Sequence, residues 1–376
     1  MKPIRFLAVF IFMIAVLITG CETGVKQADD RPVITVTDAR GRKVKVPEKV
    51  ENVICSGSGC LRYLVYLQAS DQVVGVDDIE KRERRFDARP YAIAHPELKE
   101  LPLFGEFRGY DNPELIVSLD PQPDVIFKTY SSRGFDPQRL QNITGIPVIA
   151  LDYGDLVRER ETIYSSLQLM GKVINKNERA DEVIEFFETT IADLNRRTEN
   201  AESSRSCYVG GIALKGPHGL QSTEPLYPPF YLTNINNAAS APEESLNQPR
   251  QIDFSREKIV ETDPDIIFID LATLQSKSKA SALHQLRHNP AYRTLSVHSS
   301  KEVYGLLPYN LYTQNHGSTL ANAYFVGKTV HPGRFDDINP ARKADQIYTF
   351  LLGRPVFKQL NEMFDNRAYS RLLNDE

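Results

Sequence analysis

One eight-residue pattern occurs twice in the chain and constrains the fold more than any other feature. The first copy, ELIVSLDP, runs from Glu114 to Pro121, and the second, EKIVETDP, runs from Glu257 to Pro264. Both copies follow the frame E-x-I-V-x-x-D-P, and both lead into a short apolar strand, at 124–127 and 265–269. We therefore expect a helical turn, a break at Asp-Pro and a buried strand in each of two related halves.

The surroundings of the two copies also correspond. A strand, a glycine-rich loop and a helical stretch precede each copy, at 52–67 in the first half and from 207 onward in the second. Further apolar runs of strand length lie at 73–76, 148–151 and 303–307. Short strands that alternate with helical segments favour parallel sheets covered by helices on both faces. The sequence thus predicts an α/β fold of two Rossmann-like lobes with central, mostly parallel sheets.

A single long helix is predicted between the two halves. In the segment 178–198, apolar residues recur at spacings of three and four, which forms one stripe along a helix. Asn177 suits the N-cap, and Arg196 and Arg197 suit the negative C-terminal end of the helix dipole. At about 1.5 Å per residue the helix is roughly 30 Å long. We predict an N-terminal lobe at 34–176, an interlobe helix at 177–198 and a C-terminal lobe at 199–376.

The N-terminus is typical of an export signal. Lys2 and Arg5 precede an apolar run at 6–18 that is short for a membrane-spanning helix. The run ends in the tetrapeptide ITGC, which resembles the bacterial lipobox and implies lipidation of Cys21. An uncleaved anchor helix is the alternative, and both place the rest of the chain outside the cytoplasmic membrane. The predicted segments are a lipoprotein signal peptide at 1–20 and, because it is polar and aperiodic, a flexible tether at 21–33.

The net charge and the number of cysteines limit which partners, disulfides and metal sites the chain can have. The formal net charge of −4 argues against a nucleic-acid partner, since an acidic surface repels phosphates. Besides Cys21 there are only Cys55, Cys60 and Cys207, which form neither a disulfide framework nor a zinc pattern. Cys55 and Cys60 could pair across their glycine loop or stay as buried thiols, and the sequence leaves both open.

A lipidated export signal, two α/β halves and one connecting helix together resemble the solute-binding proteins of ABC importers. The cluster concerned is the class III periplasmic binding proteins, which take up iron-siderophore complexes, haem, cobalamin and related metal compounds. The resemblance extends from Ile34 to Gly353 and includes the opening phrase VTDARGRKVKVP. Two later segments are similar to a subgroup of metal or iron-complex receptors, namely VGGIALKGPHGLQSTEPLYPPF and LPYNLYTQNHGSTLANAYFVGKTVHPGRFDDI.

The resemblance implies a monomeric binding protein without enzymatic activity. It implies delivery of a captured ligand to a permease dimer with its ATPase, and contact with the membrane through the lipid anchor only. In this family a glutamate at the tip of each lobe pairs with arginines of the permease, and that role falls on Glu114 and Glu257. A carboxylate in the first turn of a helix is also favourable through the helix dipole alone.

The ligand site is expected between the lobes. Ligands of open α/β sheets bind beyond the carboxyl ends of the strands, so loops from both lobes should converge on one cleft. The loop 210–225 is the first such loop of the C-terminal lobe, and its Gly216 allows close approach of the backbone. Arginine pairs with carboxylates or oxyanions, while phenolates are hard oxygen ligands for ferric iron. The predicted ligand-binding residues are Ser58, Cys60, Arg62, Arg108, Tyr130, Lys215, His218, Tyr309, Asn310 and Tyr312.

Several other chemistries fit the sequence less well. Pro217 directly after Gly216 excludes a Walker phosphate loop, and no G-x-S-x-G nucleophile elbow occurs. His284 and His288 have the i, i+4 spacing of a metal pair but lack a third ligand nearby. We therefore predict no bound cofactor and no bare metal site, and a ligand that is a metal complex of siderophore, haem or corrinoid type. The alternatives are a molybdate or tungstate receptor, a lipid-anchored hydrolase and a ligand-sensing lipoprotein.

Overall fold

The computed structural model describes residues 31–201, 205–240, 250–276 and 278–373. The chain divides into two units, Met1–Pro32 and Val33–Glu376, and the fold described below is that of the second. The predicted signal peptide, Cys21 and most of the predicted tether lie outside the described residues. Within the described ranges no helix has both the length and the apolar character needed to cross a membrane.

The N-terminal lobe is built on a six-stranded sheet in the order β6-β5-β4-β3-β7-β8. Its neighbours pair in parallel except β5 and β6, which are antiparallel. Every residue of two neighbouring interior strands, β3 and β7, is buried, as expected for a parallel sheet covered on both faces. The strands are β3 (Val53–Ser56), β4 (Val73–Asp77), β5 (Leu103–Glu106), β6 (Tyr110–Asp111), β7 (Val125–Thr129) and β8 (Val148–Leu151).

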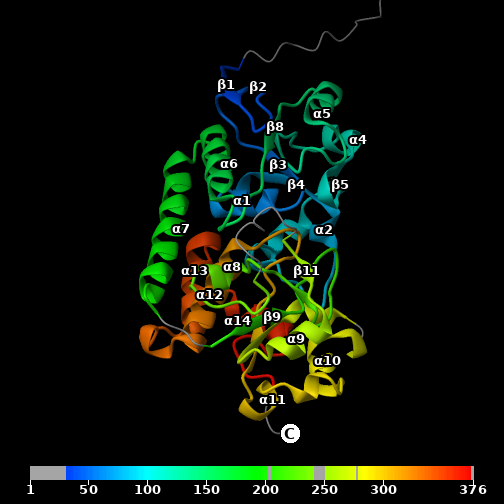
Figure 1. Cartoon of the computed structure of the whole chain (residues 1–376). Coiled ribbons are helices and arrows are strands. Elements are labelled where there is room, and N and C mark those ends of the chain that lie inside the picture. The colour runs from blue at the N-terminus through cyan, green and yellow to red at the C-terminus, as the bar shows by residue number, and fades with distance from the viewer. Residues whose placement is uncertain (1–30, 202–204, 241–249, 277, 374–376) are drawn as a thin grey trace, which may run out of the picture. The chain divides into compact units, whose positions relative to one another are not determined.

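Short helices connect these strands (Figure 1). Side-chain caps fix the starts of two of them, because Asn112 accepts from the amides of Glu114 and Leu115 and Asp136 accepts from the amides that begin α5. An antiparallel hairpin of β1 (Val33–Thr37) and β2 (Lys43–Pro47) precedes the sheet. The helices are α1 (Cys60–Tyr66), α2 (Asp78–Lys81), α3 (Pro90–Ala94), α4 (Pro113–Val117), α5 (Pro137–Thr144) and α6 (Arg160–Val173).

The C-terminal lobe contains a three-stranded parallel sheet in the order β13-β12-β9. Its strands are β9 (Cys207–Gly210), β12 (Ile266–Asp270) and β13 (Val303–Leu306). The predicted strand from 207 to 214 ends at Gly210, because Gly211 takes a positive φ of 82° and turns the chain. A small antiparallel pair, β10 (Ser222–Thr223) and β11 (Ile252–Asp253), lies beside it.

Helices follow and cover these strands. The repeated pattern forms α4 before β7 in the first lobe and α9 before β12 in the second, so the predicted correspondence of the two halves is confirmed. The remaining elements are α8 (Pro228–Tyr231), α9 (Arg256–Thr262), α10 (Ala282–His288), α11 (Val297–Ser300), α12 (His316–Val330), α13 (Pro340–Leu352) and α14 (Phe357–Met363).

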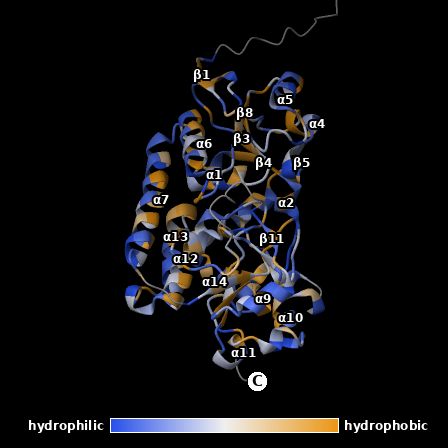
Figure 2. Ribbon diagram, in the orientation of Figure 1, coloured by the Kyte–Doolittle hydropathy of each residue, from blue (hydrophilic) through white to orange (hydrophobic). Residues whose placement is uncertain are grey.

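The predicted long helix is α7 (Asn177–Thr198). Lys176 occupies the N-cap position without a side-chain cap, so the prediction that Asn177 is the N-cap is wrong by one residue. The helix buries one stripe against α6 and α12, which belong to different lobes, and Figure 2 shows the alternation of apolar and polar faces along it. The buried residues of the stripe are Ala180, Val183, Phe187, Thr190, Ile191, Leu194 and Thr198.

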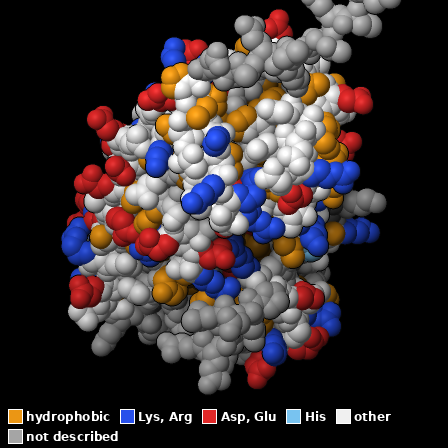
Figure 3. Space-filling view, turned by 90° about the horizontal axis from the view of Figure 1, so that it is seen from above, with side chains coloured by type: hydrophobic (Ala, Val, Ile, Leu, Met, Phe, Trp, Pro, Cys, Tyr) orange, Lys and Arg blue, Asp and Glu red, His pale blue; other side chains and the backbone are white. Residues whose placement is uncertain are grey.

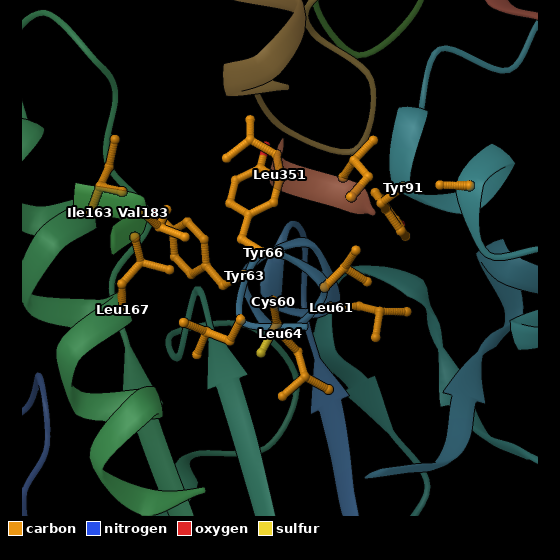
Figure 4. Packing of buried hydrophobic residues seen from close by; sticks show 14 of the residues in the cluster. Cys60, Leu61, Tyr63, Leu64, Tyr66, Tyr91, Ile163, Leu167, Val183 and Leu351 are labelled. Carbon is orange, nitrogen blue, oxygen red and sulfur yellow. The ribbon is translucent and has the colours of Figure 1, made fainter. Parts of the chain in front are cut away.

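The largest hydrophobic core extends across both lobes. All seven residues of α1 are buried, and this helix packs against α13 of the C-terminal lobe. Figure 4 shows Tyr63 and Tyr66 of α1 close to Val183 and Leu351. The lobes therefore meet through a continuous apolar core as well as through α7, and the predicted α/β architecture with two parallel sheets is confirmed.

Candidate ligand-binding cleft

A cavity of about 350 Å³ is lined by both lobes. The loops that reach it follow the carboxyl ends of β3, β4 and β5 in the first lobe and of β9, β12 and β13 in the second. This is the position in which open α/β sheets bind ligands. The lining residues are Ser58, Ile79, Arg82, Arg84, Phe107, Arg108, Ala213, Leu214, Lys215, Gly216, Pro217, Ala272, Gln275, Pro308, Asn310, Leu311, Tyr312 and Thr313.

The charges of the lining residues are all positive. Arg82, Arg84, Arg108 and Lys215 contribute cations, and among the described residues no aspartate or glutamate belongs to the lining. Arg82 is neutralised by Asp78, with Nη2 and Oδ2 2.5 Å apart. The surface seen in Figure 3, by contrast, mixes both signs of charge. A concave site lined by cations attracts and concentrates anions.

Arg84 is the cation of the lining whose side chain is partly buried without an ion pair among the described residues. Its Nε is buried and has no hydrogen-bond partner among the described residues. Burial lowers the pKa of Arg84, and the positive charge of Arg89 lowers it further. Asp87, three residues further along the chain, is paired with Arg89 at 2.7 Å. The carboxylates of Asp87 and Asp78 partly offset this lowering of the pKa.

Phe107 holds two of the guanidinium groups. It opens a short 3-10 turn (Phe107–Gly109), and its ring centroid lies 4.3 Å from Cζ of Arg82 and 4.9 Å from Cζ of Arg108. Both distances are within the range of a cation–π interaction. The ring thereby holds two positive side chains at the cavity wall.

A buried charge cluster lies behind this turn. Nζ of Lys128 donates to the carbonyl of Gly109 at 2.9 Å and forms an ion pair of 2.5 Å with Asp111. Oγ of Ser56 donates to the same carboxylate at 2.5 Å. The side chains of Lys128 and Asp111 are wholly inaccessible to solvent. The cluster joins β3, β6 and β7 and fixes the backbone next to Arg108.

One segment of the C-terminal lobe, Pro308–Asn315, makes most of the polar contacts to the first lobe. The hydroxyl of Tyr312 donates to the carboxylate of Asp77 and accepts from the amide of Arg108 at 3.1 Å. The hydroxyls of Tyr130 and Thr313 are hydrogen-bonded at 2.8 Å. Ligand-lining residues therefore also form the junction between the lobes.

Arg62 supports this segment from behind. It is buried in α1, and its Nη1 donates to the carbonyl of Gln314 at 2.8 Å while Nη2 donates to that of Leu311 at 3.3 Å. The hydroxyl of Tyr153 donates to the same Gln314 carbonyl at 2.7 Å. A second connection between the lobes is the ion pair of Arg250 with Asp155, at 2.7 Å. These contacts position the cavity wall and do not face the cavity.

Five non-glycine residues at or beside the cleft adopt positive φ. Positive φ is uncommon for residues other than glycine, and it recurs where binding sites are preorganised. Here the φ angles are 66°, 50°, 54°, 54° and 68°, in the order Arg108, Tyr130, Lys215, Tyr312 and Thr313.

Three carboxylic acids near the lobe junction are unusually hard to ionise. Burial raises the pKa of Asp77 to about 7, although the hydrogen bond from Tyr312 partly offsets the effect. Burial also raises the pKa of Glu224 to about 8, and this carboxyl accepts a hydrogen bond from the hydroxyl of Tyr309. The pKa of Asp270, at the end of β12, is raised by burial to about 8.

The structure brings half of the predicted ligand-binding residues to the cavity, namely Ser58, Arg108, Lys215, Asn310 and Tyr312. Tyr130 is exposed and contacts Thr313 of the lining. Two of the predicted residues, Cys60 and Tyr309, are buried in the hydrophobic core instead. Arg62 is buried behind the cavity wall. His218 is exposed and lies outside the lining, with its Nε2 2.8 Å from the carbonyl oxygen of Leu214. The position of a residue just after a strand predicts that its loop lies at the cleft. It does not predict the direction in which the side chain of that residue points.

Sequence reasoning missed Arg82 and Arg84. Both belong to the basic segment KRERR at 81–85, which follows β4 by one short helix. The strand-end rule that selected Ser58 applies equally to this segment, and its concentration of arginines is visible in the sequence. Phe107 and Thr313 were missed for lack of any comparable pattern.

The cysteines and the histidine pair of α10 can be placed in the structure. Cys55, Cys60 and Cys207 are free and buried, so the buried-thiol alternative holds and the disulfide does not form. Within the described ranges, no three His, Cys, Asp or Glu side chains are grouped so as to hold a metal ion. His284 and His288 do stand together on α10, with ring centroids 4.2 Å apart.

The two glutamates of the repeat lie at equivalent places. Glu114 is exposed in the first turn of α4, and Glu257 is exposed in the first turn of α9, where Arg256 approaches it at 3.0 Å. Figure 1 shows both helices on the side away from α7. Each lobe thus presents one accessible carboxylate at a matching position.

Comparison with known proteins agrees with this architecture. The chain is 21% identical over 336 residues to the molybdate-binding protein MolA of Haemophilus influenzae, with 83% of this chain and 89% of that protein covered. It is 24% identical over 201 residues to the iron-uptake system-binding protein of Bacillus subtilis, with 51% of this chain and 57% of that protein covered. A periplasmic solute binding protein from Veillonella parvula DSM 2008 has the same fold, with a TM-score of 0.68 and 18% identity over 90% of this chain and 98% of that one.

The family described as periplasmic binding protein matches residues 53–309. This range includes the sheet of the first lobe, α7 and most of the second lobe. With the cleft between two parallel sheets, it shows that the chain belongs to the periplasmic binding protein family, as an extracytoplasmic solute-binding component of an ABC importer rather than an enzyme.

Proposed function

We propose that this protein is a lipid-anchored receptor that captures an iron or other metal complex between its lobes and delivers it to the permease dimer of an ABC importer with its ATPase. One observation carries the proposal: a cavity of about 350 Å³ that is lined by loops from both sheets and, among the residues the structure describes, by cations without a carboxylate. The relative from Bacillus subtilis is an iron-uptake binding protein, which supports iron as the cargo. Anchoring rests on the apolar run at 6–18 and on Cys21.

A complexed metal fits the lining better than a bare ion. Bare metal ions are held mainly by clusters of His, Cys, Asp or Glu, and the described part of the lining offers none of these side chains. The hydroxyl of Tyr312 is already hydrogen-bonded to Asp77 and to the amide of Arg108. Arginines and a lysine instead bind the outer oxygens of a ligand that carries its own metal. The chelator then supplies the metal ligands, and the protein recognises the outer atoms of the chelator.

A molybdate or tungstate receptor is the second candidate. Two observations favour it: the positive lining and the 21% identity to a molybdate-binding protein over 89% of that protein's length. Both candidates place a negatively charged ligand in the same cavity. They differ in whether that ligand is a metal complex or a free oxyanion, so one screen that contains both kinds of ligand separates them.

That experiment is a thermal-shift screen of the chain from Arg31 onward. The panel contains ferric siderophores, ferric citrate, haem, cobalamin, free divalent metals, molybdate and tungstate. A ligand at a hundred times its Kd should stabilise the protein by about 2.7 kcal/mol, a rise in Tm of a few degrees. We expect an iron complex to shift the melt, and we expect Lys215→Ala to reduce that shift while Lys45→Ala, an exposed lysine in β2, does not. A shift by molybdate alone would favour the second candidate, and no shift by any compound would contradict both.

Docking to the permease is expected to depend on Glu114 and Glu257. Reversing both charges, Glu114→Arg with Glu257→Arg, should lower ligand uptake in cells by at least about tenfold, since unpaired charges at an interface are costly. Ligand affinity of the purified double variant should stay unchanged, because neither residue lines the cavity. Glu178→Arg is the matched control, as Glu178 is an exposed first-turn glutamate of α7. Equal uptake in the double variant and the control would contradict the docking role.

A further inference from the structure

We infer that His284 and His288 of α10 form a second binding site, which takes one divalent transition metal ion such as Ni²⁺ or Cu²⁺ outside the cleft. Both histidines line a cavity of about 290 Å³ in the C-terminal lobe. Among the described residues, this lining shares no member with the lining of the cleft between the lobes. The other residues that line the cavity are Leu274, Ser276, Ser281, Leu283, Arg287 and Arg367.

The helix fixes both histidines on one side. α10 begins after Ser281, whose side chain accepts a hydrogen bond from the amide of His284. Ala282 and Leu286 anchor the helix in a hydrophobic core, while the side chains of His284 and His288 stay accessible to solvent (Figure 1). Residues four apart on a helix are neighbours on its surface, so the two imidazoles meet without any change of the backbone.

The two rings are close enough to share a metal ion. Their centroids lie 4.2 Å apart, with an angle of 47° between the ring planes. A metal ion binds imidazole nitrogen at about 2.0–2.1 Å, so two nitrogens on one ion are about 3 Å apart. Small rotations of the side chains bring rings at this spacing to that separation. Neither ring forms a hydrogen bond or an ion pair with another described residue, so both keep a nitrogen for a ligand.

The charges beside the pair keep an imidazole in the form that binds metals. Burial lowers the pKa of His284, and the positive charges of His288 and Lys279 lower it further. A metal ligand must be unprotonated, and at neutral pH His284 is therefore neutral and available. Acid should release the metal, because protons compete for the same nitrogens.

The donor atoms select the class of metal. Imidazole suits Cu²⁺, Ni²⁺ and Zn²⁺, whereas Mg²⁺ and Ca²⁺ require several oxygen ligands, and the described lining contains no carboxylate. The positive charges of Arg287 and Arg367 further disfavour an ion held by electrostatic attraction alone. Two imidazoles leave coordination positions open. The cavity has room for the waters that fill them, at about 30 Å³ each.

Calorimetric titration with Ni²⁺ tests the inference, on the chain from Arg31 onward without an affinity tag. We expect one ion to bind per chain. His284→Ala and His288→Ala should each lower the affinity by at least about tenfold, since the second imidazole of a linked pair acts at a high effective concentration. His218→Ala is the matched control, because His218 is an exposed histidine outside both cavities, and its affinity should stay within about twofold.

Two further measurements use the unmodified chain. Lowering the pH from 7.5 to 5.5 should weaken Ni²⁺ binding by about tenfold or more, as both imidazoles become protonated. Mg²⁺ should give no binding signal. Failure of Ni²⁺ to bind, equal affinities in all three variants, or equal binding of Mg²⁺ would each overturn the inference. None of these results bears on the proposed receptor function, because neither histidine lines the cleft.

Discussion

Replacement of Lys128 by methionine is expected to destabilise the protein by about 3–5 kcal/mol, the usual cost of removing one partner of a buried ion pair. The variant leaves the carboxylate of Asp111 without its cation at a site that solvent does not reach. It also removes the hydrogen bond to the carbonyl of Gly109, which supports the turn that carries Arg108. Urea unfolding followed by circular dichroism measures the change in the free energy of unfolding.

The double variant Lys128→Met with Asp111→Leu distinguishes the ion pair from simple loss of packing. Replacing both charges by apolar side chains of similar size is often neutral or nearly so, because no unpaired charge remains. We expect the double variant to recover much of the stability that Lys128→Met loses. A double variant less stable than the single one would show that the pair is not the source of the effect.

The stability of this protein is expected to fall as pH rises from about 4 to 8, which is the second large effect. The pKa values of Asp77, Glu224 and Asp270 are raised to about 7, 8 and 8 in the folded chain, chiefly by burial. Between the ordinary carboxyl pKa near 4 and these raised values, the folded state binds more protons than the unfolded state. The contribution of each group is therefore fully present at acid pH and is lost as pH rises through its folded pKa.

Each pKa unit corresponds to about 1.4 kcal/mol, so the three groups together should lower the free energy of unfolding by several kcal/mol across this range. Below about pH 4 the trend reverses, since carboxylates with lowered pKa, such as Asp193 beside Arg197, then lose their pairing. Denaturant unfolding from pH 4 to pH 9 measures the profile. Asp270→Asn should flatten the fall above pH 6 and raise stability at pH 8.5. If the free energy of unfolding rose towards pH 9 in both the parent and the variant, the buried carboxyl groups would not be the cause of the pH dependence.

The repeated pattern, together with the strands and helical stretches around both copies, predicts the architecture. The pattern E-x-I-V-x-x-D-P marks α4 and α9, and the apolar runs after it form β7 and β12 at the centre of two parallel sheets. Such elements are predictable because hydrophobic periodicity and Asp-Pro breaks are determined by residues that are neighbours in the sequence. The long helix α7 was equally accessible, since its buried stripe has the period of a helix.

The cleft was only partly predictable, because side-chain direction depends on tertiary packing. Cys60 and Arg62 follow β3 as the strand-end rule requires, yet they belong to a helix whose residues are all buried between the lobes. Tyr309 points into the core towards Glu224, a contact 85 residues apart in sequence that no local pattern indicates. Arg82 and Arg84, in contrast, stand in a basic segment that the same rule could have selected.

The most direct test of the central claim, that the cleft between the lobes binds a metal chelate, is a crystal structure with ferric citrate measured at the iron absorption edge. Anomalous scattering locates iron without reference to the protein atoms. We expect one iron peak inside the cavity, with ligand oxygens in hydrogen-bond contact with Arg84, Arg108 and Lys215. An iron peak elsewhere on the protein, or an empty cleft in a crystal of protein that binds the compound in solution, would contradict the claim.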